Sequence, residues 1–530
     1  MLSRTRHFTL IVENHSWLTG DLLKRTSEAR SWLRAHVIGS VSDDGGLRDR
    51  CASRVLESAL MLHLLRVQRV RPAVRDAVSG YLVRCRESLG SRQDSVAQLE
   101  LALISAVLGE KSGTAVRPLG FLDDFDHFTS PRKRFMFRVI LTELGVDDAD
   151  QSLDLAAVNY DEYATWVNLE MCALKVLAAH HRAEPALATD TDRAYLHETL
   201  ASGSDRSVFE ADVFAHVLGL LAVRRTRPES PLIADGIEAL LRCQNQDGGF
   251  PFIAGWEPFL TAVAGIALVE AGAPTDVIES MGDYVARHQG PDGGWPFAPR
   301  VRQSDADCSP YCLEFLRGAG ERRFAESIDR GDTYLETLSN DTGGFATYYH
   351  GNTAEIGVTG SAVAALATAD RFTGIRDAAV RYLLDRQQPD GTFERGWSLS
   401  EANAIMRALI AFAHYPEPPS GELGTRITTA VAASTRFLVE SQDTGGGWGH
   451  RAGDPIDVLS TAYSLIALGG SSEAATLRAG LEYLLSQQEA NGGFSAPPDS
   501  AGPRPLPHDA PVLADCFALL AMSHLMTASS

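Results

Sequence analysis

The segment QGPDGGW, residues 289–295, is the most informative about the fold, because variants of it recur along the chain. From about residue 235 onward the same unit occurs six times, about every 50 residues. Each unit has a helical stretch with a polar end, a Gly-rich turn, an aromatic residue and a second, apolar helical stretch. The six turns are QNQDGGF (244–250), QGPDGGW (289–295), SNDTGGF (339–345), QQPDGTF (387–393), QDTGGGW (442–448) and EANGGF (489–494).

The residue types in each turn suit a tight connection between two helices. Gln and Asp or Asn close the first helix, and the Gly pair permits a positive φ that other residues resist. The apolar stretches that follow, such as TAVAGIALVEAG (261–272) and TGSAVAALATA (359–369), predict buried inner helices. Six such helix pairs predict two concentric rings, an (α/α)6 barrel.

The N-terminal half carries a weaker form of this pattern. DDGGL (43–47) precedes one apolar stretch, and YDEYATWVNLEMCALKVLAAHH (160–181) reads as another buried helix. We therefore expect an all-α chain with three parts: an N-terminal segment (1–24), a degenerate α/α barrel (25–230) and the (α/α)6 barrel (231–530).

Composition limits the classes of function. A chain of 530 residues is too long for one ordinary core, and 45% hydrophobic with 22% charged residues is typical of a soluble globular protein. The net charge of −20 argues against a nucleic-acid partner. The seven cysteines form no metal-binding pattern, and the N-terminus has no apolar run long enough for a signal peptide. We expect a cytoplasmic protein without stable membrane insertion.

The turns resemble the QW repeats of the squalene–hopene cyclase and class II terpene cyclase family. The resemblance covers nearly the whole chain, and it is strong from about residue 235 to the end. It implies that the two barrels are the family's γ and β domains, together a βγ double toroid. It also implies an enzyme that starts the cyclisation of a linear prenyl diphosphate with a proton and keeps the diphosphate.

The acidic motif of that family, DxDD, corresponds here to SDADCSPY, residues 304–311. Asp305 and Asp307 match its first and middle acids, whereas Cys308 stands where the last Asp is usual. The departure is similar to the DxDTT form of the family's drimenyl diphosphate synthases. The resemblance therefore favours conversion of farnesyl diphosphate to a drimenyl-type diphosphate over conversion of geranylgeranyl diphosphate to a copalyl-type one.

The chemistry of alkene protonation supports this pair independently. It requires a carboxyl group that stays protonated in an apolar cavity. A carboxylate about 4 Å away adds roughly 4 kcal/mol at an effective dielectric of 20, or about three pKa units. We assign the proton to Asp307 and an ionised, hydrogen-bonded role to Asp305. The alternative is that Asp305 only caps the helix and Asp307 lies in its first turn.

A cyclisation chamber also needs aromatic faces, each of which stabilises a cation by about 0.5 to 2 kcal/mol. Most aromatic residues in such repeats are core residues, so each candidate has packing as its alternative role. The final base could be His350, Glu355 or water. The candidate substrate-binding residues are Trp256, Phe297, Cys308, Tyr311, Tyr348, Tyr349, Arg395 and Trp397.

Two further assignments concern the diphosphate. Asp205 and Glu210 have the spacing of the DxxxxE element that helps bacterial class II cyclases bind Mg²⁺, although surface charges can meet that spacing by chance. Arg395, in DGTFERGW, resembles the Lys of the family's DKW segment and suits phosphate, but an exposed loop arginine is the alternative.

Other functions remain open at this point. A protein prenyltransferase β-subunit shares the (α/α)6 barrel and would bind zinc, here through Asp305 or Asp307, Cys308 and His508. A non-catalytic toroid that binds a partner or a lipid is a third possibility, because fold does not fix function. A squalene cyclase is a weaker option, since no segment predicts a membrane-insertion patch.

Overall fold

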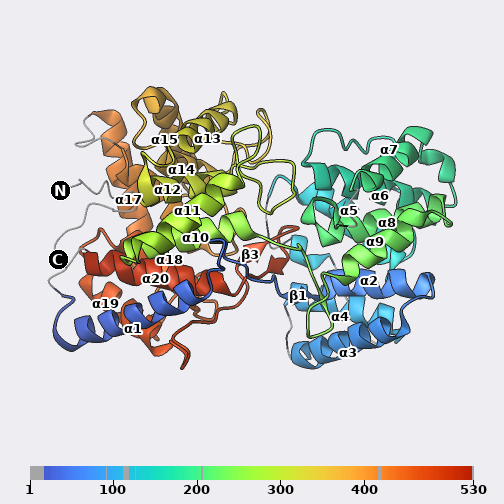
Figure 1. The fold of residues 1–530 in the computed structure, drawn as a ribbon, viewed down its shortest axis with the longest axis horizontal. Coiled ribbons are helices and arrows are strands. Elements are labelled where there is room, and N and C mark those ends of the chain that lie inside the picture. The colour runs from blue at the N-terminus through green and yellow to red at the C-terminus, as the bar shows by residue number, and fades with distance from the viewer. Residues whose placement is uncertain are drawn as a thin grey trace. The chain divides into compact units, whose positions relative to one another are not determined.

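The computed structural model describes residues 17–90, 92, 94–110, 119–123, 125, 127–203, 207–415 and 421–527. The described chain is mostly helical and divides into two compact units (Figure 1). The barrel unit contains the described residues up to Asp49, together with Trp256–Ala501 and those from Asp509 onward. The second unit contains Arg50–Gly255 and Gly502–His508.

The barrel unit has two rings of helices. Over the described residues, six inner helices form a closed ring in which each contacts the next, and the last contacts the first. The inner helices are α10 (Glu257–Glu270), α12 (Cys308–Gly320), α14 (Ile356–Ala365), α16 (Glu401–Ala413), α18 (Val458–Leu468) and α20 (Val512–Thr527). The outer elements are α1 (Gly20–Gly39), α11 (Thr275–Arg287), α13 (Ala325–Thr337), the 3₁₀ turn η4 (Asp370–Phe372), α15 (Thr373–Arg386), α17 (Glu422–Glu440) and α19 (Ala474–Ser486).

Each Gly-rich turn joins its own helix pair to the next outer helix. In the turn after α11, the amide of Gln289 donates to the carbonyl oxygens of Gly293 and of Ser327 in α13, both at 2.7 Å. Gly293 has φ of +94°, and a Cβ there would lie 2.5 Å from the carbonyl oxygen of Arg330. The indole of Trp295 donates to Val285 in α11 at 2.8 Å. The repeated motif is therefore the device that closes the ring.

Helix α1 completes the outer ring, although it lies more than 200 residues before the next outer helix in sequence. The amide of Gln488, in the turn after α19, donates to Ala29 of α1 at 3.1 Å. The backbone N–H of Leu47, at the end of the DDGGL turn, donates to the hydroxyl of Thr261 in α10 at 2.9 Å. The DDGGL turn thus belongs to the barrel unit, whereas we expected it in the N-terminal domain.

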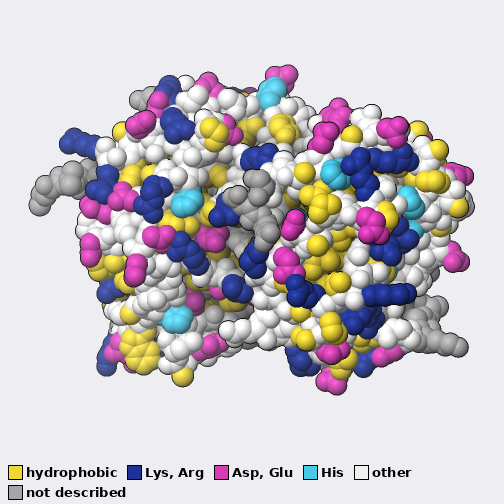
Figure 2. Space-filling view, turned by 45° about the vertical axis from the view of Figure 1, so that its right-hand side comes forward, with side chains coloured by type: hydrophobic (Ala, Val, Ile, Leu, Met, Phe, Trp, Pro, Cys, Tyr) yellow, Lys and Arg dark blue, Asp and Glu magenta, His cyan; other side chains and the backbone are white. Residues whose placement is uncertain are grey.

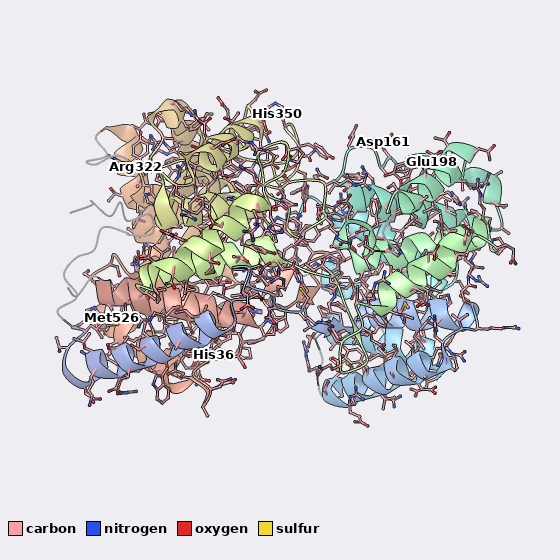
Figure 3. All side chains as sticks on the ribbon, in the orientation of Figure 1. His36, Asp161, Glu198, Arg322, His350 and Met526 are labelled. Atoms are coloured by element: carbon pink, nitrogen blue, oxygen red, sulfur yellow. The ribbon has the colours of Figure 1, made fainter. Side chains whose placement is uncertain are left out.

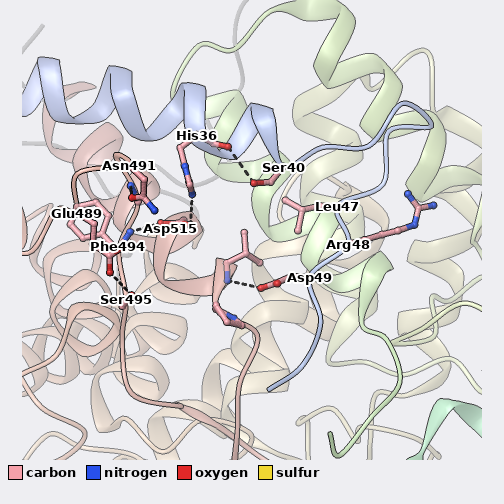
Figure 4. Close-up of a pocket in the computed structure, with 13 residues that line it drawn as sticks. His36, Ser40, Leu47, Arg48, Asp49, Glu489, Asn491, Phe494, Ser495 and Asp515 are labelled. Atoms are coloured by element: carbon pink, nitrogen blue, oxygen red, sulfur yellow. Dashed lines mark hydrogen bonds and ion pairs between the residues drawn. The ribbon is translucent and has the colours of Figure 1, made fainter. Parts of the chain in front are cut away.

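A pocket of about 280 Å³ lies where α1 meets the start of α20 (Figure 4). His36 of α1 faces Asp515 of α20, with 3.5 Å between Nε2 and Oδ2. Asp515 accepts the backbone N–H of Phe494 at 2.7 Å. In other repeats a neutral hydroxyl does this work, as Ser309 does for Trp295. Burial raises the pKa of Asp515 to about 6.

The second unit is built from eight further α-helices of the described chain. The turn 244–250 belongs here, because the backbone N–H of Phe250 donates to the hydroxyl of Ser58 in α2 at 2.9 Å. Strands β1 and β2 pair antiparallel, with Arg54 opposite Phe250. The elements are β1 (Ser53–Arg54), α2 (Val55–Val67), α3 (Pro72–Leu89), α4 (Ser95–Leu108), η1 (Gly120–Leu122), α5 (Ser130–Glu143), α6 (Thr165–His181), η2 (Pro185–Leu187), α7 (Asp190–Ala201), η3 (Phe209–Ala211), α8 (Val213–Thr226), α9 (Pro231–Leu241), β2 (Phe250–Pro251) and β4 (Pro507–His508), whereas β3 (Ser500–Ala501) ends the central stretch of the barrel unit.

The units therefore differ from the expected boundaries at 24, 25–230 and 231–530. The chain leaves α1 and its turn to begin the inner helix α2 of the second unit, and it leaves α9 and its turn to begin α10 of the barrel unit. At these two points the outer helix and its turn lie in one unit and the following inner helix lies in the other. The order of the repeats along the sequence does not predict this division.

The surface and the helix lengths agree with the composition. On the face drawn in Figure 2, acidic and basic side chains are interspersed. Over the described ranges, none of the helices has the length and the apolar character that crossing a bilayer requires. All seven cysteines lie in the described chain, and none of them forms a disulfide bond.

Candidate active site

Asp305 caps the N-terminus of α12 from a buried position. Its Oδ1 accepts the backbone N–H groups of Cys308 at 2.7 Å and of Asp307 at 3.0 Å. Its own N–H donates to the carbonyl of Trp295 at 3.1 Å. Burial raises the pKa of Asp305 to about 6, and the bond from Cys308 opposes this rise. These bonds hold the carboxyl group in one orientation at the start of the helix.

The same cap is present in another repeat. Asp457 accepts the N–H of Ser460 at 2.7 Å, and its own N–H donates to the turn residue Trp448 at 2.9 Å. Asp305 therefore occupies the position that the repeat itself uses to start an inner helix. Its capping role follows from the fold and does not by itself indicate catalysis.

Asp307 is the acid that the repeat does not need. The residue two places after the cap is Leu459 in α18, and Asp307 makes no capping bond to α12. Asp307 is partly buried, and its charge helps to raise the pKa values of Cys308 and Tyr311. Asp307 thus lies beside the buried Asp305, at the N-terminus of an inner helix of the ring.

An aromatic wall runs from α10 to α16 beside this acid pair. Trp256 stacks on Phe259, with ring centroids 4.6 Å apart, and Phe259 meets Tyr311 edge-on at 5.0 Å. The guanidinium of Arg407 lies 4.0 Å above the Tyr311 ring. Trp256 and Tyr311 were expected in the lining, and the structure brings them together.

The other candidate aromatic residues lie on loops of the barrel unit, and Tyr348 follows Thr347, whose carbonyl accepts the N–H of Ala306 at 2.8 Å. Tyr348 and Trp397 are partly buried and meet edge-on, with centroids 6.2 Å apart. Phe297 is partly buried as well. Tyr349 is 40% exposed, so we remove it from the lining. The candidate base His350 is also exposed and lies at the edge of the unit, as Figure 3 shows.

The environment of Cys308 does not suit the zinc site that a protein prenyltransferase β-subunit would have. The thiol of Cys308 is buried against Asp305, and burial raises its pKa, whereas zinc binds the thiolate. His508 lies in the second unit, where its ring is 5.3 Å from Phe252 and burial lowers its pKa to about 3. The buried thiol of Cys308 therefore disfavours a zinc site that uses this residue, whereas the neutral imidazole of His508 is a form that can bind zinc.

The residues proposed for the diphosphate and for Mg²⁺ have different outcomes. Arg395 is partly buried, not an exposed loop residue, and donates to the carbonyl of Leu399 at 3.2 Å. Asp205 lies outside the described residues. Glu210 is buried in the second unit, with φ of +48°. Over the described ranges, no three His, Cys, Asp or Glu side chains are placed to hold a metal ion.

Sequence reasoning missed Phe259, Glu314 and Arg407. Glu314 and Arg407 are 3% and 1% exposed, and each lies among apolar residues of an inner helix, in CLEFLRG and AIMRALI. A charged residue within an apolar stretch is the signal that could have identified both, because full burial of a charge requires a specific environment. Phe259 carries no such signal and looks like any core aromatic residue.

Comparisons with known proteins agree with this architecture. The prenyltransferase alpha-alpha toroid domain family matches residues 213–479. Drimenyl diphosphate synthase from Streptantibioticus cattleyicolor is 38% identical over 93% of this chain and 94% of its own. Drimenyl diphosphate synthase from Streptomyces showdoensis has the same identity and the same coverage.

Among solved structures, ent-copalyl diphosphate synthase from Streptomyces platensis aligns with a TM-score of 0.62 and 19% identity. It covers 95% of this chain and 100% of its own, and at this identity the likeness concerns the fold alone. Together with the curated relatives, the repeats and the acid pair, these matches identify the chain as a member of the class II terpene cyclase family.

Proposed function

We propose that this enzyme cyclises farnesyl diphosphate to a drimenyl-type diphosphate by protonating the distal alkene and retaining the diphosphate. The similarity to two drimenyl diphosphate synthases over 93% of the chain supports the substrate. The observation that carries the mechanism is Asp307, an acid beside the buried cap Asp305 that the helical repeat does not require.

The reaction begins with the proton on Asp307. The O–H bond breaks, the proton forms a C–H bond with one carbon of the distal alkene, and a cation forms on the other carbon. Asp305, held by two backbone N–H groups, keeps its negative charge close by and favours the protonated form of its neighbour.

Ring closure then moves the positive charge along the substrate. Each further alkene supplies an electron pair to the cation, and the charge passes the aromatic wall of Trp256, Phe259 and Tyr311. Aromatic faces stabilise a cation without forming a covalent bond to it, each by about 0.5 to 2 kcal/mol. Loss of a proton leaves an alkene, and the C–O bond to the diphosphate stays intact throughout.

Arg395 and Mg²⁺ remain part of the proposal for the diphosphate. The guanidinium of Arg395 suits phosphate oxygens, and burial lowers its pKa. Mg²⁺ is the natural counter-ion of a prenyl diphosphate, because hard oxygen ligands suit it. We also propose that the reaction takes place in the cytoplasm, as the seven cysteines without disulfide bonds favour.

The test is incubation of the purified protein with farnesyl diphosphate and, separately, with geranylgeranyl diphosphate, each with Mg²⁺. Phosphatase treatment and mass spectrometry then identify the alcohols. We expect a bicyclic C15 alcohol from the first substrate. A bicyclic C20 alcohol alone would replace the substrate with geranylgeranyl diphosphate, and linear alcohols from both substrates with folded protein would refute the proposal.

A further inference from the structure

A buried pair of charges lies inside the ring of inner helices. Glu314 is on α12 and Arg407 is on α16, and α14 lies between these helices in the ring. Glu314 Oε1 is 4.0 Å from Arg407 Nη1, and both side chains are 2% exposed. Side chains from helices that are not ring neighbours can meet in this way only across the interior. The pair therefore belongs to the space that the ring encloses.

Glu314 differs from an ordinary buried partner in an ion pair. Neither of its carboxyl oxygens has a hydrogen-bond partner among the described residues, and the guanidinium of Arg407 lies 4.0 Å above the Tyr311 ring. On the same helix, Arg317 shows the usual arrangement and donates to Asp332 of α13 at 2.6 Å. Buried carboxyl groups nearly always have such donors. The carboxyl of Glu314 is thus buried without a hydrogen-bond donor among the described residues.

Glu314 lies on the same face of α12 as Asp307. Asp307, Tyr311 and Glu314 are spaced by four and three residues, which places them in one row. With a rise of about 1.5 Å per residue, Glu314 lies about 10 Å further along the helix than Asp307. The acid and the base each contact one end of the bicyclic skeleton, so their separation is the length of the two fused rings plus one contact distance at each end. A base for that cation must lie at the far end of the chamber from the acid.

We propose that Glu314 is the base that removes the proton from the cyclised cation. This assignment rests on the proposed function and concerns the last step of the reaction, the loss of a proton from the cyclised cation. The C–H bond beside the cationic carbon breaks, its electron pair becomes the new alkene bond, and the proton forms an O–H bond on Glu314. When product leaves, Glu314 gives this proton to water and Asp307 takes one from water, so the proton count closes.

The groups facing Glu314 suit a base of this kind. Burial raises the pKa of Glu314 to about 7, while Arg407 and Arg317 oppose the rise. A base that titrates near the working pH is well matched to accept a proton and to release it again. Tyr311 stays neutral, because burial raises its pKa to about 12, so it adds no second negative charge beside Glu314. Arg407 offsets the carboxylate charge within the apolar ring.

The test compares product distributions of the full-length enzyme with farnesyl diphosphate. In Glu314→Gln we expect substrate consumption to fall about 10- to 100-fold and the native alkene to give way to hydroxylated or isomeric products. Glu314→Asp, which keeps the charge beside Arg407, should restore part of the native alkene. The control is Asp332→Asn, which breaks an equally buried ion pair outside the interior and should lower the melting temperature without changing the product ratio.

The outcomes separate this inference from the proposed function. If folded Glu314→Gln and Glu314→Asp both give the native alkene at the wild-type rate, Glu314 is not the base, although the enzyme remains a cyclase. Complete loss of substrate consumption in a folded variant would also overturn the inference, because protonation precedes the base step. Failure of the wild type to cyclise any prenyl diphosphate would instead refute the proposed function.

Discussion

Replacing Asp305 with Asn should move the pH dependence of turnover rather than abolish the fold. Asn keeps an oxygen that accepts the N–H groups of Cys308 and Asp307, and Asn is as good a helix cap as Asp. The substitution removes the negative charge beside the proton donor. At a separation of roughly 4 to 6 Å and an effective dielectric of 20, two unit charges interact by about 3 to 4 kcal/mol, which favours the protonated form of the donor.

The sign follows from which form reacts. The protonated form of Asp307 is active, so turnover falls as pH rises through its pKa. Losing the neighbouring charge disfavours the protonated form, and the alkaline limb of the profile should shift to lower pH. At neutral pH this corresponds to a loss of about 10²- to 10³-fold.

The assay is the initial rate of cyclised alcohol formation as a function of pH, with melting temperatures recorded in parallel. The matched control is Asp457→Asn, which alters the equivalent cap of α18, where Leu459 replaces the second acid. It should leave the limb in place. If Asp305→Asn also leaves the limb where the wild type has it, the electrostatic role of Asp305 is refuted.

Three further changes have defined outcomes. Asp307→Asn should lower turnover at least 10³-fold with little change in melting temperature, because Asp307 makes no capping bond; a thermal shift together with residual activity would contradict this. Gly293→Ala should destabilise the barrel by about 2 to 4 kcal/mol in urea unfolding, since φ is +94° and the new Cβ would lie 2.5 Å from the carbonyl of Arg330. Asp515 has a folded-state pKa of about 6, above its unfolded value, so the folded state binds more protons than the unfolded state between about pH 4 and 6. The free energy of unfolding therefore decreases as the pH rises through that range. Asp515→Thr should remove this loss and stabilise the protein by roughly 1 to 2 kcal/mol at pH 7.5 but not at pH 4, and equal effects at both pH values would count against it.

The repeated turns made the barrel predictable, because each residue type in them has a physical task in the structure. The Gln amides, the Gly with positive φ and the aromatic residue make the contacts that such a turn needs. The sequence could not predict that α1 is an outer helix of the barrel unit. Contacts such as Gln488 to Ala29 connect residues from opposite ends of the chain, and local patterns carry no information about them.

For the site, the sequence located the acid pair but not its surroundings. Asp305 and Asp307 were found through a motif, and only the structure shows that Asp305 caps α12 in the way that Asp457 caps α18. Tyr349 was misplaced because adjacent aromatic residues point in different directions. Glu314 and Arg407 meet across a ring of helices, which no spacing within either helix encodes.

The most direct test of proton-initiated cyclisation is the reaction of wild-type enzyme with farnesyl diphosphate in D₂O, with the product analysed by NMR and mass spectrometry before and after phosphatase treatment. We predict a cyclised product that retains its diphosphate and carries one deuterium on the ring carbon that was part of the distal alkene. Release of inorganic diphosphate, with no deuterium in the hydrocarbon, would show that ionisation starts the reaction and would contradict the role of Asp307.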